Sequence, residues 1–459
     1  MISRFRVSVV LAVCLSALAA FLLLRVPSQP GSLAQTRSDW ENAIANDAGT
    51  YSPFVSRQAV AFGESVAVRD LPSSAIATTI KGYKFKTVED KMDEVRIERE
   101  NAIRAAKGLP PLTEHQKEDR EKNFMNTERV KKSLPGYGNA AKGSFLDQAL
   151  SLNAPAVPAV MPTPAVNFDG LASSDNVAAF GSTFAPPDTV GDVGPNNYVQ
   201  MDNALVAIYD KSGTLLKPKF KLSSITGVVG GPCATVDDGD PMVLYDPLSD
   251  RWLLSQFCVT PVPGHQVFAI SKTPDPMGAY YIYDFVHPST DFQDYPHIGV
   301  WPSAYFMSTN QFNQAGTTFR GAGSFAYDRV KMVAGDPAAS YIYVNQFPSI
   351  CPSCGGQLPT DIDGTMTPPI GAPNLFMEFR ADEFADPVDG LKIFAFTPNF
   401  ISPALSTFTQ VGTDLQLAAF DGRAPTGRSV AEQPGTTSGL DVIADRIDRK
   451  STRLNSSHG

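Results

Sequence analysis

The sequence predicts an all-β fold, a β-propeller of about four visible blades, and three features of the chain support this prediction. A hairpin pattern occurs three times, opening at Asp188, Asp240 and Asp294, which are 52 and 54 positions apart. Further short runs rich in aromatic and β-branched residues follow each hairpin, as in strands. The chain also has 35 glycines and 37 prolines, which suits many tight turns. A period of roughly 40–60 residues with several short strands is typical of propeller blades.

Each predicted blade contains about four strands. Within each hairpin an apolar run reaches a Pro-containing turn and restarts at an aromatic residue, Tyr198, Trp252 or Tyr305. The strands expected after the hairpins are 205–210, 266–271, 279–285, 323–328 and 340–347, and a fainter fourth copy has 374–379 and 391–396. A β-sandwich also consists of short strands and turns, but it does not require a repeat. The repeat therefore favours the propeller.

The C-terminal residues 448–459 carry a different signal. Asp448–His458 reads DRKSTRLNSSH, which matches the translation of a common sequencing-library adapter. We exclude this segment from the fold, as one excludes a fusion scar. We expect the natural coding sequence to end at or before Ile447, so that residues 174–447 form an incomplete propeller-like domain cut from a larger ring.

The N-terminal residues 1–34 predict export. Two arginines precede an apolar run from Val7 to Leu24, and Ser32-Leu33-Ala34 is a small-x-small cleavage site. Cleavage after Ala34 gives a secreted or cell-surface protein. The alternative is an uncleaved signal anchor in the inner membrane, with the rest of the chain facing the periplasm. Only residues 7–24 would then contact a membrane.

Three segments lie between the signal and the propeller. Residues 35–80 are expected to be irregular. Residues 81–134 predict an αα-hairpin, because helical periodicity stops at Gly108-Leu-Pro-Pro and Thr113-Glu-His-Gln then has the form of a capping box. Residues 135–173 form a Pro/Ala-rich linker, which we expect to be extended and to separate the propeller from the preceding part.

Four cysteines remain after the signal: Cys233, Cys258, Cys351 and Cys354. An even number in an exported chain predicts two disulfides. Cys233 and Cys258 flank the second hairpin, and Cys351-Pro-Ser-Cys354 lies in a Pro/Gly-rich loop between strands. A redox CxxC normally opens a helix, so a structural bridge is favoured over an oxidoreductase site. A zinc site lacks a second pair of ligands.

Four segments of the chain resemble a known group of proteins: APPDTVGDVGPNNYVQMDN, GDPMVLYDPLSDRWLLSQF, TPDPMGAYYIYDF and YPHIGVWPSAYFMSTNQF. They are similar to large secreted bacterial proteins with a predicted propeller-like domain and no established function. The resemblance covers about residues 180–447. It implies further blades after Asp441, and it implies no activity, substrate or catalytic residue.

The recurring carboxylates are the candidates for chemistry. In a propeller the first strands line the central channel, so Asp188, Asp240 and Asp294 could converge at its mouth and act as acid and base on a glycosidic bond. Asp188, Asp192, Asp237, Asp238, Asp361 and Asp363 are weak candidates for Ca²⁺ ligands. The third interpretation is structural, since an Asp before a turn commonly accepts local backbone N–H groups. We favour this structural interpretation and predict no cofactor, with structural Ca²⁺ as the alternative.

Other motifs of catalysis are missing from the sequence. No HExxH, GxSxG or phosphate-loop pattern is present. The net charge of −9 argues against nucleic acid as a partner. Five aromatic residues are candidates for stacking on sugars: Tyr280, Tyr281, Trp301, Tyr305 and Phe306. The sequence therefore predicts a non-enzymatic binding module for an extracellular protein or carbohydrate, and a glycan-acting hydrolase is the alternative.

Overall fold

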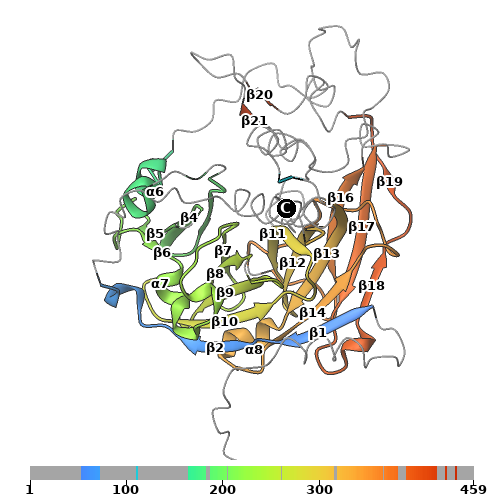
Figure 1. Cartoon of the computed structure of the whole chain (residues 1–459), viewed down its shortest axis with the longest axis horizontal. Coiled ribbons are helices and arrows are strands. Elements are labelled where there is room, and N and C mark those ends of the chain that lie inside the picture. The colour runs from blue at the N-terminus through green and yellow to red at the C-terminus, as the bar shows by residue number, and fades with distance from the viewer. Residues whose placement is uncertain are drawn as a thin grey trace, which may run out of the picture. The chain divides into compact units, whose positions relative to one another are not determined.

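The protein consists mostly of antiparallel β-sheets, with a few short helices (Figure 1). The computed structural model describes residues 53–72, 110–111, 164–181, 184, 187–203, 205–259, 261–314, 318–364, 366–380, 389–420, 429–431 and 440–441. All of these belong to one compact unit, Pro53–Gly459. The α-helices among them are α6 (Ser173–Phe180), α7 (Ser223–Thr226) and α8 (Arg329–Ala334).

Four sheets follow one another along the chain, and we number them in that order. Sheet I comprises β3 (Val190–Val193), β4 (Asn197–Met201), β5 (Leu205–Asp210) and β6 (Phe220–Lys221). Sheet II comprises β7 (Met242–Asp246), β8 (Arg251–Cys258), β9 (His265–Ser271) and β10 (Tyr280–Val286), and sheet III comprises β11 (Phe292–Val300), β12 (Tyr305–Phe312), β13 (Phe319–Tyr327) and β14 (Ser340–Asn345). Sheet IV comprises β15 (Leu358–Pro359), β16 (Asn374–Arg380), β17 (Gly390–Thr397), β18 (Thr407–Gln410) and β19 (Leu415–Gln416).

The three predicted hairpins are present and antiparallel. Asp192 lies opposite Val199 in the first hairpin, Leu244 opposite Leu253 in the second, and Ile298 opposite Met307 in the third. The other predicted runs also form strands, with bounds within a few residues of those expected. The all-β prediction is therefore confirmed.

Consecutive sheets are joined at their first strands. Strand β3 contacts β7, β7 contacts β11, and β11 contacts β15. The described residues contain no closed barrel and no closed ring of sheets. A separate two-stranded pair, β20 (Ser429–Ala431) and β21 (Leu440–Asp441), follows sheet IV in the chain.

Two strands from the start of the described chain extend the outer edges of sheets II and III. Strand β1 (Phe54–Gln58) pairs with β14, and β2 (Ala61–Glu64) pairs with β10, as Figure 1 shows in blue. The expectation of an irregular segment over 35–80 did not include these strands. Both are short, and their partners are more than 200 residues away in the sequence, so local pattern carries little sign of them.

Three separate apolar cores lie between consecutive sheets. The first packs sheet I against sheet II, the second packs sheet II against sheet III, and the third packs sheet III against sheet IV. Alternate residues of one strand serve different cores: Trp252 and Leu254 face the first, and Leu253 faces the second. Sheets II and III are therefore buried on both faces, which explains their nearly continuous apolar strands.

Residues 164–181 cover the outer face of sheet I. The ring of Phe168 lies 5.0 Å from that of Tyr209 and 6.2 Å from that of Tyr198, and Phe180 packs in a small core with Leu205. We expected 135–173 to be an extended spacer, but its described end packs on the sheet, and helix α6 was not predicted. The predicted signal 1–34 and all of the predicted αα-hairpin except Pro110 and Pro111 lie outside the described residues.

No helix in the described part of the chain is both long and apolar enough to cross a membrane.

Candidate functional site

Two of the three recurring aspartates, Asp188 and Asp240, belong to a relay of hydrogen bonds that connects neighbouring sheets. Asn203, in the turn after β4, donates through Nδ2 to Oδ2 of Asp188 at 2.6 Å. The backbone N–H of Asp240 donates to Oδ1 of Asn203 at 3.1 Å, and Oδ2 of Asp240 accepts the backbone N–H of Tyr295 at 3.0 Å. The relay therefore runs from sheet I through sheet II to sheet III.

Backbone conformation at these positions is unusual. Asp188 has φ 42° and Asp240 has φ 46°, in the left-handed region. In the third hairpin the corresponding value is φ 53° at Tyr295, directly after Asp294. Asp tolerates this region better than most residues, because its short side chain can bond locally. Asp188 and Asp240 thus lie at sharp turns just before the first strands of their sheets, whereas Asp294 and Tyr295 lie at an irregularity within β11.

Two other predicted carboxylates make the same kind of contact between first strands. Oδ2 of Asp192 accepts the backbone N–H of Tyr245 at 2.8 Å, which joins β3 to β7. Oδ1 of Asp361 accepts the backbone N–H of Val300 at 2.7 Å, which joins the segment after β15 to β11. These N–H groups lie on the outer edges of β7 and β11, where no further strand of the described residues pairs with them.

Asp237 and Asp238 are buried between α7 and sheet II. Asp237 accepts hydrogen bonds from the backbone N–H and the hydroxyl of Ser223 and from Nε2 of Gln256. Asp238 accepts the backbone N–H of Val259 at 3.0 Å. Burial raises the pKa of Asp237. Both carboxylates hold loops in place.

The described residues do not gather the predicted Ca²⁺ ligands. No three of Asp188, Asp192, Asp237, Asp238, Asp361 and Asp363 bring carboxylate oxygens within 4.8 Å of one another. Asp294 lies partly exposed on β11, and Asp363 is exposed beyond β15.

The grouping that does have such spacing is Cys351, Cys354 and Glu378, all buried. The two cysteines form a disulfide, as predicted. Glu378 accepts hydrogen bonds from the backbone N–H of Gly355 at 3.0 Å and from Nη1 of Arg380 at 2.7 Å. Both sulfurs and the carboxylate are therefore already bonded, and the cluster fastens the loop after β14 to sheet IV.

The second predicted disulfide is also present. Cys233, in the turn before β7, is joined to Cys258 at the end of β8. Two disulfides are typical of proteins that lie outside the cytosol.

Most of the aromatic residues proposed for sugar stacking belong to the cores. Tyr280, Trp301, Tyr305 and Phe306 are each at most 3% exposed. Tyr281 is partly exposed, but Phe62 stacks on it and Nζ of Lys272 lies 4.9 Å above its ring. The four buried aromatic residues are therefore not accessible for stacking on a sugar.

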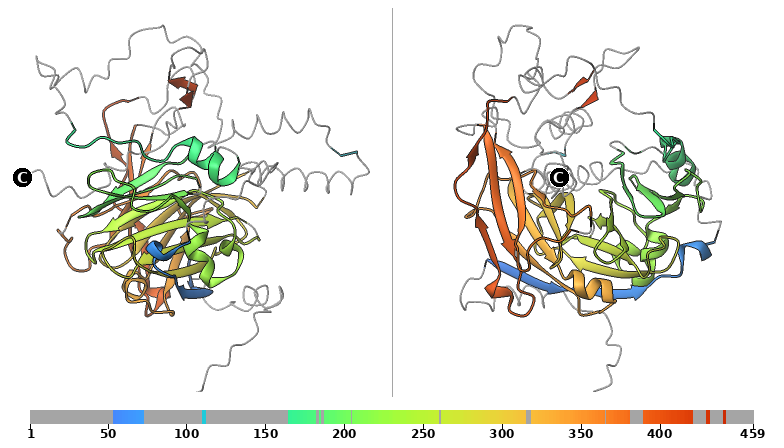
Figure 2. Two further views of the ribbon diagram at one scale, coloured as in Figure 1. Left: turned by 90° about the vertical axis from the view of Figure 1, so that its left-hand side faces the viewer. Right: turned by 180° about the vertical axis from the view of Figure 1, so that it is seen from behind.

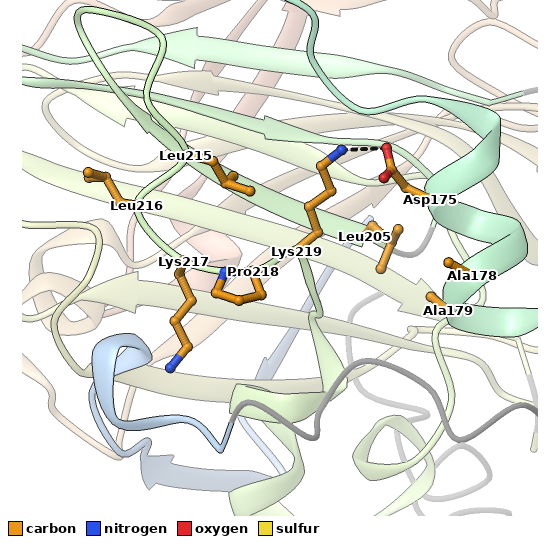
Figure 3. A pocket seen from close by; sticks show the side chains of 9 residues that line it. All are labelled: Asp175, Ala178, Ala179, Leu205, Leu215, Leu216, Lys217, Pro218 and Lys219. Atoms are coloured by element: carbon orange, nitrogen blue, oxygen red, sulfur yellow. Dashed lines mark hydrogen bonds and ion pairs between the residues drawn. The ribbon is translucent and has the colours of Figure 1, made fainter.

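The structure contains a groove that sequence analysis did not identify. It lies between α6 and the loop that joins β5 to β6, and it has a volume of about 500 Å³ (Figure 3). Leu205, at its base, is buried, and the residues that line it are Asp175, Ala178, Ala179, Leu205, Leu215, Leu216, Lys217, Pro218 and Lys219. The groove thus has an apolar floor, and its charges lie on the rim.

The charged residues of the groove form contacts that fix the loop between β5 and β6 to α6 and to residues 69–71. Nζ of Lys219 forms an ion pair with Asp175 of α6, which Figure 3 shows as a dashed line. Nζ of Lys217 donates to the backbone carbonyls of Arg69 and Leu71. Leu215 and Leu216 remain 38% and 40% exposed between these contacts. The groove is therefore formed by fixed elements, although its apolar floor remains open to a ligand.

A buried carboxylate fixes α6 to sheet I beneath the groove. Asp202 is 3% exposed, and its Oδ2 accepts Nδ2 of Asn176 at 2.8 Å. Its Oδ1 accepts the backbone N–H of Leu205 at 3.2 Å. Burial raises the pKa of Asp202 to about 6, more than these hydrogen bonds lower it. Two signals in the sequence could have revealed the helix: Asp175, whose carboxylate accepts the backbone N–H of Ala172, and Gly181, which ends it at φ 75°.

No protein-family model matches the chain, and no curated protein matches it.

Proposed function

We propose that the chain is an exported β-propeller-like protein that acts as a non-enzymatic binding module at the cell surface or outside the cell. We propose further that it holds an apolar segment of an extracellular protein in the groove beside α6. The observation that carries the non-enzymatic part is the hydrogen bond from the N–H of Tyr295 to Asp240, because it commits a recurring carboxylate to joining sheets.

The propeller interpretation draws on the order of the sheets. Each successive sheet places its first strand beside that of the preceding sheet, and a buried core fills the space between them. This is the order of blades around a channel. The recurring hairpins support the same interpretation. The ring proposed here is open among the described residues.

Export is supported by the two disulfides together with the signal-like residues 1–34 of the sequence. Disulfides persist in oxidising compartments and are rare in the cytosol.

The chemistry of the groove favours a protein partner over a carbohydrate. Sugar sites commonly use an aromatic face, and the lining contains no aromatic residue. An apolar floor of leucine and alanine suits aliphatic side chains of a peptide. The volume lies within the usual range of ligand sites, roughly 300–1,000 Å³.

The hydrolase alternative has one observation in its favour. Burial raises the pKa of Asp188, as a general acid requires, although its bond from Asn203 lowers that pKa. A test must therefore measure both binding and glycan release.

Peptides selected from a random phage-displayed library on the full chain provide that test. We expect Leu216→Glu, in the groove, to weaken binding of the selected peptides by at least about tenfold, or about 1.4 kcal/mol. Val228→Glu is the matched control, since Val228 is an exposed apolar residue outside the groove lining, and it should bind as the wild type does. Equal binding by both variants would refute the groove. Release of sugars from glycans by the wild type, lost in Asp188→Asn, would replace the binding module with the hydrolase.

A further inference from the structure

The two faces of sheet IV differ in what covers them. One face packs against sheet III through aromatic side chains of the third core: Phe376, Phe394, Phe396 and Phe408. Strand residues alternate between faces, so the residues between these aromatics point the other way. We call that opposite face the outer face of sheet IV.

The outer face is apolar and partly exposed. Its members include Leu375 and Met377 on β16, Leu391, Ile393 and Ala395 on β17, and Leu415 on β19. They form cross-strand pairs: Leu375 lies opposite Ala395, Met377 opposite Ile393, and Leu391 opposite Leu415. None belongs to a buried core, and Leu415 is 52% exposed.

The outer face also lacks charge. Its positions on β18 are Thr407 and Thr409, so none of these eight positions carries a charged side chain. The face toward sheet III is the one that carries Glu378, Arg380 and Lys392, and each of these forms an ion pair. Although 19% of the residues of the chain are charged, the charged side chains of this sheet lie on the face that packs against sheet III. This is the reverse of a solvated sheet, whose outer face is usually polar.

Sheet I, the first of the four sheets, also has an apolar outer face, and other residues of the chain cover it. Phe168 covers Tyr198 and Tyr209, and α6 covers Leu205. Figures 1 and 2 show α6 beside sheet I and β17, β18 and β19 at the opposite end. At one end of the outer face, Phe420 packs on Phe379, which lies opposite Leu391, with the ring centroids 5.7 Å apart. Within the described residues, no helix or strand covers the outer face of sheet IV as extensively as α6 covers sheet I.

We propose that the outer face of sheet IV binds the outer face of sheet IV in a second copy of the chain. A two-fold axis makes such an interface self-complementary, because each apolar patch meets its own equivalent. The net charge of −9 opposes close approach of two copies elsewhere, whereas this face brings no like charges together.

The size of the face sets the expected affinity. Only β16 and β17 have seven or more residues, so the face spans at most roughly 23 Å by 19 Å. Two such faces bury at most on the order of 900 Å², below the roughly 1,200–2,000 Å² of stable complexes. We therefore expect a weak dimer that forms in the micromolar range and dissociates on dilution.

Two methionines make the test specific. Met377 lies on the outer face, and Met366, 65% exposed, lies outside it. Sedimentation velocity of the full chain should show a monomer–dimer equilibrium, and peroxide should oxidise Met377 several-fold more slowly as the dimer forms. The oxidation rate of Met366 should not depend on protein concentration.

Substitutions distinguish a dimer that forms through the outer face of sheet IV from a dimer that forms through another surface. Ile393→Lys and Leu415→Lys should each leave the chain monomeric, and Val330→Lys, at an exposed position of α8, should dimerise as the wild type does. The Leu415 variant is a second check because Leu415 is largely exposed and its change should not impair folding. A monomer at all concentrations overturns the proposal; slow oxidation of Met377 in that monomer means that the chain itself covers the face. A dimer that survives both substitutions also overturns it.

Discussion

The carboxylate of Asp240 accepts the backbone N–H of Tyr295 at 3.0 Å, and these two residues are 55 positions apart in the chain. The bond crosses from sheet II to sheet III at their first strands. Because β11 is an edge strand of sheet III, the side chain of Asp240 accepts an N–H that an adjacent strand would otherwise bind. Asp240 therefore has a structural role in the assembly of these two sheets.

Removal of this acceptor should destabilise the protein, and replacement by another acceptor should not. We expect Asp240→Ala to lower the free energy of unfolding by about 1–3 kcal/mol, because it leaves the N–H of Tyr295 unpaired. Alanine also tolerates φ 46° poorly. Asp240→Asn retains an acceptor and tolerates that conformation, so it should stay near the wild type. Urea denaturation measures both, and equal losses in the two variants would contradict this role.

Much of the fold follows from local sequence, and the contacts between sheets do not. The alternation around Trp252 and Leu253 identifies β8 as a strand with two buried faces, and the repeat predicts its neighbours. The partner of Asp240 cannot be predicted locally, because Tyr295 belongs to the next repeat. The same holds for β1, whose residue Arg57 lies opposite Tyr341. The groove was missed because it combines α6 with a loop more than 30 residues further along the chain.

A buried ion pair between sheets II and III was not predicted either, and its loss should be costly. Arg329 of α8 donates through Nε and Nη2 to the two carboxylate oxygens of Asp246 at 2.6 and 2.9 Å. The side chain of Asp246 is fully buried. We expect Arg329→Met to lower the free energy of unfolding by about 3–5 kcal/mol, because it leaves a buried carboxylate without its countercharge.

Lys331, two positions along the same helix, provides the control for that experiment. Its ion pair with Asp328 spans 3.6 Å and its side chain is 38% exposed. Lys331→Ala should cost less than about 1 kcal/mol. Similar losses in the two variants, measured by thermal or urea unfolding, would mean that Arg329 acts through helix packing and not through its charge.

The two disulfides should contribute unequally to stability. Cys233 and Cys258 are 25 positions apart, and Cys351 and Cys354 only 3. On the chain-entropy account, the longer loop is worth about 3.5 kcal/mol and the shorter about 2 kcal/mol. The double variant Cys233→Ala/Cys258→Ala should therefore unfold at a lower urea concentration than Cys351→Ala/Cys354→Ala. The reverse order would show that the short bridge acts mainly by holding the loop beside Glu378.

The stability of the protein should depend on pH through Asp202. Burial raises the pKa of its carboxyl from 3.8 to about 6 in the folded state. The folded chain therefore binds this proton more tightly than the unfolded chain does. The contribution of Asp202 to stability is complete below pH 3.8 and is lost as the pH rises through 6.

Asp202→Asn should remove that dependence while keeping α6 in place. Asparagine can still accept the N–H of Leu205, and Oδ1 of Asn176, which has no hydrogen-bond partner, can accept its amide N–H. Urea unfolding between pH 4 and pH 7 should show a smaller fall in stability for the variant than for the wild type. An unchanged slope would mean that other carboxyls, such as Asp188 or Asp237, whose pKa values burial also raises, account for the pH dependence instead.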